Sequence, residues 1–253
     1  MRNIKLVLAY DGTGYAGWQR QLGQPTIQQV VEEAIARLTQ APVILHGAGR
    51  TDAGVHAQGM TANFQTDSVI PLSGLVNGLN SMLPEAVRVL EAEKVAHDFH
   101  ARYNATGKVY EYAFMATEIM PPCQRLYAAQ VRAPFMCDAV RLCLPMVVGT
   151  HDFSSFEASG SRDLTITGGR GAVRTIFAAR LDEDGKDSRM FRLTIAGDGF
   201  LRHMVRNIVG TLFGVGRGRL TPLDFQDIVA ARDRTLAGAT APAKGLTLKT
   251  VLY

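Results

Sequence analysis

The sequence has few cysteines and no pattern that would pair them. It contains three in 253 residues, Cys123, Cys137 and Cys143, and no two of them have C-x-x-C spacing. An odd number without that spacing argues against a disulfide framework and against a zinc site. We therefore expect no bound metal and three inert thiols that pack in a reducing compartment.

A long apolar run is also missing. No stretch reaches the length of a membrane span, and the first residues lead into a strand-like alternation in place of a signal peptide. Both absences favour a cytoplasmic protein without a membrane partner. With 47% hydrophobic and 20% charged residues, a chain of this length suits one large globular domain or two closely packed halves.

The net charge of +4 is small but unevenly distributed. Residues 1–126 contain 10 basic and 11 acidic side chains, whereas residues 127–253 contain 17 basic and 12 acidic ones. Most of the basic side chains in the second part are arginines, which suit bidentate contacts with phosphate better than lysines do. The pattern fits either a solvated alkaline surface or a face that binds a polyanion.

Strand and helix patterns alternate along the chain. The predicted strands cover residues 3–10, 60–64, 86–95, 108–115, 172–181, 189–196 and 245–253, and the predicted helices cover residues 26–38, 71–83, 138–148 and 200–214, with one more starting at Thr221. Two similar halves, 1–105 and 106–253, predict an α+β fold. We expect a central, mainly antiparallel sheet flanked by helices, with an active-site cleft between the halves.

Local signals refine three of these helices. Thr26 and Gln29 have the spacing of a capping box, and Thr221-Pro222-Leu223-Asp224 starts a capped helix. Pro145 predicts a kink in the helix at residues 138–148.

One glycine-rich segment, Gly47–Ala57, has the side chains for chemistry. Its polar members are a cation, a hydroxyl, a carboxylate and an imidazole: Arg50, Thr51, Asp52 and His56. Glycines let such a loop approach a ligand closely. Judged by residue type alone, a turn with a local ion pair is the commoner interpretation.

The identity of the residues changes that balance. Gly49 to Ala57 reads G-R-T-D-A-G-V-H-A and resembles the signature of the tRNA pseudouridine synthase A family at all nine positions. Further stretches resemble the family in order along the chain: Tyr10–Gln19, Leu79–Pro84, Phe99–Arg102, Gly149–Phe156, Val173–Ile176, Phe200–Gly210 and Ala241–Ala243 with Gly245–Leu246. The resemblance covers essentially the whole chain.

The resemblance implies an isomerase that converts uridine to pseudouridine at positions 38 to 40 of the tRNA anticodon stem-loop. The N1–C1′ bond must break, the base must rotate, and C5 must join C1′. Asp52 would be the nucleophile or essential carboxylate, and attack at C1′, attack at C6 and a glycal route all stay open. The family resemblance also implies a homodimer that binds one tRNA across both subunits and needs no cofactor or metal.

Two arginines are expected beside Asp52. Arg50, two residues away, would pair with it and hold the space of an extruded base; the plain alternative is a structural salt bridge, and both can be true. The resemblance implies Arg206 as the ion-pair partner of Asp52, and we expect Arg202, one helical turn earlier, to contact phosphate or tRNA. A helix that otherwise looks buried seldom carries two arginines without a reason.

Three more residues complete the expected substrate contacts. Tyr110 shares one side of its strand with Tyr112 and Phe114; it would stack on the target base and help move the C5 proton, while the other two pack in the core. Leu248 would line the floor of the pocket. Arg20 is a candidate for contact with the RNA backbone.

Other features favour ordinary structural roles. His56 is expected to be a hydrogen-bonded loop histidine, and His151 and Asp152 to form a turn. Residues 157–171 and Thr247 depart from the family pattern, which leaves details of substrate contact open. Two rival functions stay open as well: an inactive RNA-binding relative, and a nucleoside hydrolase, for which no second carboxylate beside Asp52 is evident.

Overall fold

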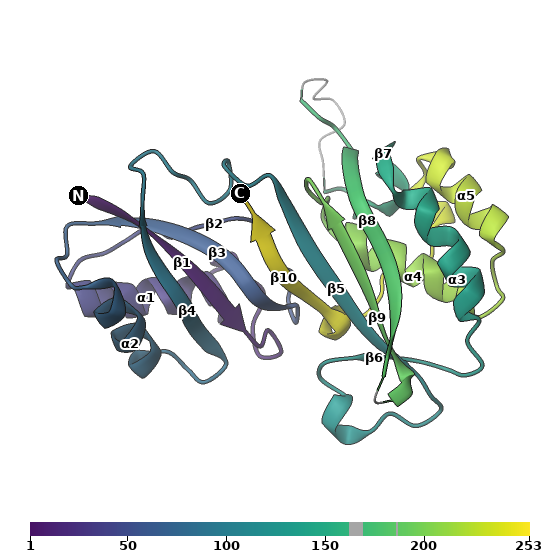
Figure 1. Ribbon diagram of the computed structural model, residues 1–253, viewed down its shortest axis with the longest axis horizontal. Coiled ribbons are helices and arrows are strands. Elements are labelled where there is room, and N and C mark those ends of the chain that lie inside the picture. Colours follow the sequence, from purple (N-terminus) through teal and green to yellow (C-terminus); the bar gives the residue numbers. More distant parts are fainter. Residues whose placement is uncertain (162–168, 186) are drawn as a thin grey trace. The chain divides into compact units, whose positions relative to one another are not determined.

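The computed structural model describes residues 1–161, 169–185 and 187–253 (Figure 1). Part of the unusual 157–171 loop, residues 162–168, lies outside this range. The chain forms two compact units, one of Met1–Thr106 with Thr247–Tyr253 and one of Gly107–Leu246. These units differ from the expected halves in the last seven residues, which join the first unit because their strand pairs there.

The first unit is built from strands and two helices. In chain order they are β1 (Arg2–Tyr10), α1 (Ile27–Thr39), β2 (His46–Gly47), β3 (His56–Thr66), α2 (Leu72–Met82), β4 (Val87–Val95) and β10 (Leu246–Leu252). The strands run in the order β4-β1-β3-β10, with β2 paired to β3. These strands pair antiparallel, except that β10 is parallel to β3. Figure 1 shows β10 in yellow beside β3.

Period-2 alternation explains how β1 sits in this unit. Ile4, Leu6 and Leu8 are fully buried on one face of the strand, as expected for residues two apart. The apolar stripe of α1 is buried too, with Val31 and Ile35 wholly inaccessible. The core of this unit therefore forms between the sheet and the inward stripes of its helices.

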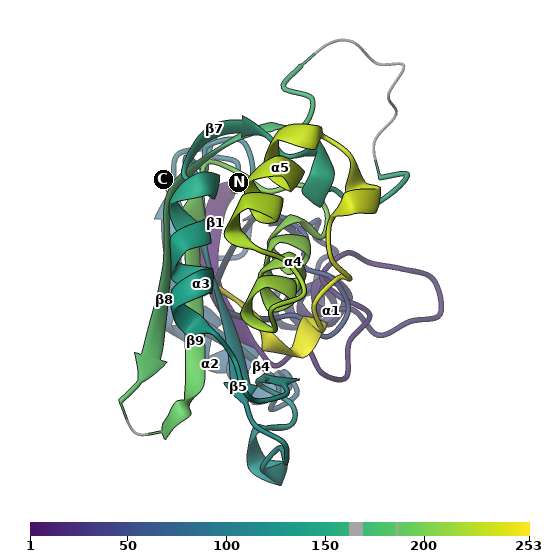
Figure 2. The same ribbon diagram turned by 90° about the vertical axis from the view of Figure 1, so that its right-hand side faces the viewer.

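The second unit repeats this arrangement with three helices. Its elements are β5 (Gly107–Ala116), β6 (Ala129–Val131), α3 (Cys137–Cys143), β7 (Gly149–Asp152), β8 (Val173–Asp184), β9 (Asp187–Gly197), α4 (Met204–Gly216) and α5 (Pro222–Ala231). The strands run antiparallel in the order β5-β9-β8-β7, and β6 is parallel to β5. The three helices pack together on one side of the sheet (Figure 2).

The α+β class and the mainly antiparallel pairing are thus confirmed, with two local differences. The helix expected over residues 138–148 ends at Cys143, and Pro145 is the second residue of a short 3₁₀ turn, Leu144–Val147, so the proline stops the helix instead of kinking it. The helix expected from residue 200 begins only at Met204, after a left-handed residue, His203. No helix in the described part of the chain is long and apolar enough to cross a membrane.

The three cysteines are all free thiols, and they differ in exposure. Cys143 is buried, and burial raises the pKa of its thiol to about 11, which fits the expected inert packing. Cys123 is exposed, so the packing role expected for it is wrong.

The two predicted helix caps have different outcomes. Thr221 and Asp224 make both reciprocal bonds at the start of α5, so that prediction is confirmed. Thr26 makes no cap bond at the start of α1, and its buried hydroxyl has no hydrogen-bond partner among the described residues. The amide of Gln29 instead donates to Glu33 one turn later, at 2.8 Å.

A paired substitution separates these two threonines. Thr221→Ala is expected to lower the free energy of unfolding by about 1 kcal/mol, because an N-cap acceptor is lost. Thr26→Val is expected to be neutral or stabilising, because it removes a buried hydroxyl that bonds to nothing. Chemical denaturation of both variants measures the difference, and an equal loss in both would contradict this account.

Candidate active site

The Asp52 segment connects β2 to β3, and a contact between two buried side chains helps to hold it in place. The hydroxyls of Thr51 and Tyr10 lie 2.8 Å apart, and both residues are buried. Asp52 is half-buried and Arg50 is exposed, so the segment presents its carboxylate and its cation at the surface of the unit. A fixed, partly shielded carboxylate of this kind can act on a bound group.

A tight turn follows the carboxylate. The Val55 amide donates to the Asp52 carbonyl at 3.1 Å, and Gly54 within the turn has a φ of +76°. Glycine adopts that left-handed conformation without steric cost, which explains its presence two residues after Asp52.

The loop between β1 and α1 packs directly on this turn through backbone contacts. Amide-to-carbonyl hydrogen bonds join Trp18 to Thr51 and Gly54 to Tyr15. A Cβ on Gly12 would lie 2.1 Å from the Val55 carbonyl oxygen, which is far inside contact distance. The approach of the two loops therefore requires glycine at position 12, and the loops support one another.

His56 fastens the same two loops at the start of β3. Its Nδ1 accepts a hydrogen bond from the Gly12 amide at 3.1 Å and lies 3.1 Å from an Asp11 carboxylate oxygen. The side chain is only 7% exposed. This agrees with the expected role of a hydrogen-bonded loop histidine.

Leu248 is brought near the end of the Asp52 segment by strand pairing. It lies in β10, which runs parallel to β3, and its register partner is Ala57. Leu248 is buried, with 1% of its surface exposed. The end of the nine-residue signature and this distant leucine thus lie on neighbouring strands of the first unit.

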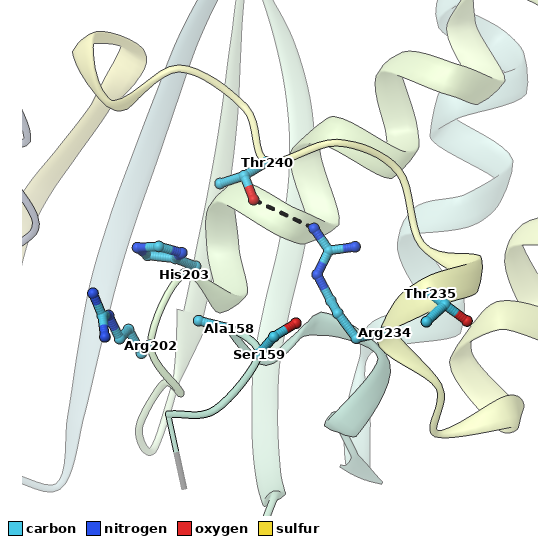
Figure 3. Close-up of a pocket in the computed structure, with 7 residues that line it drawn as sticks. All are labelled: Ala158, Ser159, Arg202, His203, Arg234, Thr235 and Thr240. Atoms are coloured by element: carbon cyan, nitrogen blue, oxygen red, sulfur yellow. Dashed lines mark hydrogen bonds between the residues drawn. The ribbon is translucent and has the colours of Figure 1, made fainter.

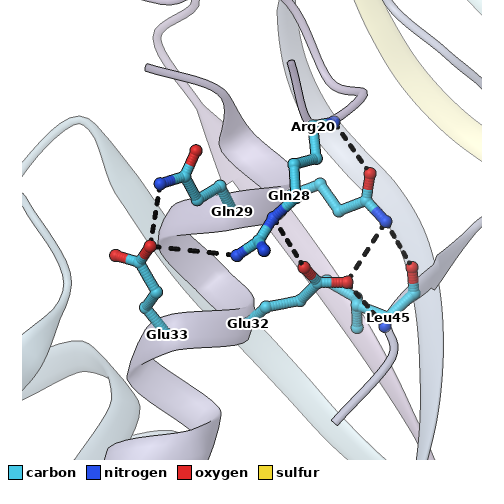
Figure 4. Close-up of polar contacts among 6 residues, drawn as sticks. All are labelled: Arg20, Gln28, Gln29, Glu32, Glu33 and Leu45. Atoms are coloured by element: carbon cyan, nitrogen blue, oxygen red, sulfur yellow. Dashed lines mark hydrogen bonds and ion pairs between the residues drawn. The ribbon is translucent and has the colours of Figure 1, made fainter. Parts of the chain in front are cut away.

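Arg20 is engaged in contacts that the sequence did not indicate. Its guanidinium lies 3.4 Å from Glu32 and 3.8 Å from Glu33, both on α1 (Figure 4). Its backbone amide also donates to the Gln28 side chain at 3.0 Å. Two carboxylates already offset this positive charge, which weakens the case for a phosphate contact by Arg20.

In the second unit, the three aromatic residues of β5 lie on one buried face, as alternation predicts. Phe114 is surrounded by the rings of Phe135, Phe191 and Phe213, at centroid distances of 5.1–5.2 Å. Tyr110 differs, because its ring contact is an edge-on approach to Phe200 at 5.1 Å.

Tyr112 is a core tyrosine with a satisfied hydroxyl. Its hydroxyl donates to the Pro242 carbonyl at 2.7 Å. Burial raises the pKa of Tyr112 far above its ordinary value, and the nearby charge of Arg206 opposes the shift only in part. Tyr112 therefore stays protonated, and Tyr110 is the better candidate for contact with a substrate.

The two arginines expected at the start of α4 occupy different environments. Arg206 is half-buried, and its Nε donates to the Ala241 carbonyl at 2.8 Å. Arg202 precedes the helix, is exposed, and lines a pocket with His203 and Arg234. Arg234 was not predicted as a site residue, because nothing in its local sequence separates it from other surface arginines.

Of the described residues, no group of three or more His, Cys, Asp or Glu side chains could hold a metal ion.

Comparison with known proteins gives one consistent match. The model of the tRNA pseudouridine synthase family matches residues 6–104 and 145–253. The Asp52 segment, Arg202, Arg206 and Leu248 lie within these stretches, whereas Tyr110 lies between them.

Full-length relatives support the same assignment. A protein named tRNA pseudouridine synthase A 1, from Desulfotalea psychrophila, is 51% identical over 253 residues, which span 100% of both chains. Proteins named tRNA pseudouridine synthase A from Geobacter sulfurreducens and Clostridium acetobutylicum are 44% and 43% identical, again over the full length of both chains.

Proposed function

Because the chain belongs to the tRNA pseudouridine synthase family, and is thus an isomerase that acts on tRNA, we propose that it converts uridine to pseudouridine at positions 38 to 40 of the anticodon stem-loop, with Asp52 as the essential carboxylate. The proposal rests on the observation that the chain on both sides of Asp52 is held in place by hydrogen bonds. The residue before it, Thr51, forms a buried hydroxyl contact with Tyr10. The turn that begins at Asp52 is bonded to the loop between β1 and α1. Such fixed geometry is what a catalytic carboxylate needs.

The reaction conserves every atom and moves no net electrons, so it consumes no oxidant, reductant or second substrate, and we propose that it uses neither cofactor nor metal. The N1–C1′ bond breaks, the detached base turns, C5 bonds to C1′, and the proton lost from C5 is balanced by one gained at N1. Asp52 either attacks the sugar or the base or stabilises positive charge that develops at C1′. Since the base must not escape, the site must exclude water while the base turns.

The remaining residues have supporting roles in the proposal. Arg50 and Arg206 are the cationic partners of the Asp52 carboxylate, as the family resemblance implies. Tyr110 stacks on the base, with its hydroxyl available for proton transfer, and Leu248 forms an apolar floor beneath it. Arg202 contacts phosphate. Arg20 contributes only if its side chain leaves Glu32 and Glu33.

Two further parts of the proposal concern the assembly. We propose a cytoplasmic homodimer that binds one tRNA across both subunits, on the basis of the family resemblance. Light scattering coupled to size-exclusion chromatography measures the mass of the free protein, and a monomer at micromolar concentration would contradict the dimer.

The activity is tested with unmodified tRNA that carries tritium at C5 of uridine. The protein is expected to release tritium and to leave pseudouridine at positions 38, 39 or 40, and a transcript with cytidine at all three is expected to release none. Free uracil among the products would indicate a hydrolase instead. Binding without tritium release would indicate an inactive RNA-binding protein.

A further inference from the structure

The second unit contains a pocket of about 390 Å³ at the start of α4. Seven residues line it: Ala158, Ser159, Arg202, His203, Arg234, Thr235 and Thr240. In Figure 3, Arg202 and His203 lie on one side and Arg234 on the other, with Ser159 between them and Thr240 above. The lining offers cations and hydroxyls, no carboxylate, and little apolar surface, which does not suit an apolar ligand.

The two arginines of this pocket keep their positive charge uncompensated. In the described ranges of the chain, no acidic side chain forms an ion pair with Arg202 or Arg234. The guanidinium of Arg234 donates to neutral oxygens: Ala237 O at 3.1 Å, Asn207 Oδ1 at 3.2 Å and Thr240 Oγ1 at 3.3 Å. These bonds orient the guanidinium and leave its charge available to a ligand.

A buried polar network fixes that orientation. Asn207 is completely buried, and its Nδ2 donates to the Phe156 carbonyl at 2.8 Å. Its Oδ1 accepts from the Thr240 hydroxyl at 2.7 Å as well as from Arg234. Because both the nitrogen and the oxygen of the Asn207 amide form hydrogen bonds, the oxygen faces Arg234. These bonds hold the Arg234 guanidinium in place at the pocket.

The residues just before α4, which line the same pocket, include one with an unusual backbone conformation. His203 has a left-handed conformation with φ of 62°, which is uncommon for a residue other than glycine. The preceding residue, Arg202, is held at its carbonyl by the Ala158 amide at 2.9 Å. Unfavourable backbone conformations persist where surrounding structure enforces them, and they concentrate at functional sites.

We propose that this pocket binds a backbone phosphate of the tRNA. The inference rests on the proposed function and deepens it by assigning Arg234, together with Arg202, to a specific subsite. Two guanidiniums without carboxylate partners favour an anion, and their planar forks match the oxygens of phosphate. The hydroxyl of Ser159 adds a neutral donor, whereas that of Thr235 already donates to Asp233 at 2.7 Å.

Salt dependence of tRNA binding tests this subsite. Each phosphate contact contributes a slope of about 0.9 to the plot of log affinity against log salt for duplex nucleic acid. Arg202→Gln is expected to reduce the slope by about this amount and to weaken binding of the unmodified tRNA about fivefold to tenfold at 0.1 M salt. Arg234→Gln is expected to do the same, with thermal melting as a check that its buried neighbours still fold.

Arg219→Gln is the matched control, since Arg219 is exposed in the same unit and does not line the pocket. It removes the same charge, and its slope and affinity are expected to equal those of the wild type within twofold. If Arg202→Gln or a folded Arg234→Gln behaves like this control, the subsite proposal is overturned. Tritium release by the wild-type protein is measured separately, so a failure of the isomerase proposal is distinguishable from a failure of the subsite.

Discussion

Asp52→Asn is expected to reduce tritium release from uridine C5 by at least roughly 10³-fold, while the protein still binds tRNA. Asparagine has nearly the same shape as aspartate. The hydrogen bond from the Val55 amide to the carbonyl of residue 52 and the hydroxyl contact between Thr51 and Tyr10 are therefore kept. Only the negative charge and the nucleophilic oxygen are lost. Because the substrate is a polyanion, removal of this charge is expected to leave its affinity equal or higher.

Asp227→Asn is the control for this substitution. Asp227 is exposed on α5 and is not part of the proposed site, so the same change of charge is expected to leave the rate unchanged. Single-turnover release of tritium with excess enzyme isolates the chemical step from binding. A rate for Asp52→Asn within tenfold of the wild type would remove Asp52 from the chemistry.

Much of the fold could be predicted because its signals are local. The alternation in β1 and the apolar stripe of α1 each report which face of an element is buried, and the structure bears out both. The capping box at Thr221 is also local, and the short carboxylate of Asp224 reaches back to the cap residue. Predictions of this kind depend on residues within one turn of each other.

Two predictions near α1 failed because the side chains concerned have other partners. At α1, the glutamine expected to close the cap bonds along the helix to Glu33, and the Gln28 amide bonds to Glu32 and to the Leu45 carbonyl. Glu32 in turn faces Arg20 (Figure 4). Gln29 is engaged by a competing partner one turn along α1, whereas the engagement of Arg20 depends on how the loop before α1 folds against that helix.

The candidate site divides in the same way. Asp52 and Arg50 were predicted from one contiguous motif that resembles a known family, and the structure adds the reason for Gly54, whose φ is positive. The phosphate pocket was not predicted beyond Arg202. Asn207, Arg234 and Thr240 come from different segments, and only their convergence makes them a site.

Gly12→Ala is expected to damage both folding and catalysis although it lies 40 positions before Asp52 in the sequence. The new Cβ would lie 2.1 Å from the Val55 carbonyl oxygen, so the two loops must separate. Overpacking of this kind costs about 1–3 kcal/mol of unfolding free energy. A shift of about 1 Å in a catalytic group can cost roughly 10²-fold in rate, and we expect a fall of that size in single-turnover tritium release.

Gly14→Ala is the matched control, because it adds the same methyl group to the same loop. A Cβ at Gly14 would meet no atom within 4 Å, and its backbone does not need a positive φ. We expect this variant to melt and to react like the wild type. Similar losses in both variants would mean that the loop is merely sensitive to alanine. A loss confined to Gly12→Ala would show that close contact between this loop and the turn after Asp52 holds the carboxylate in its reactive position.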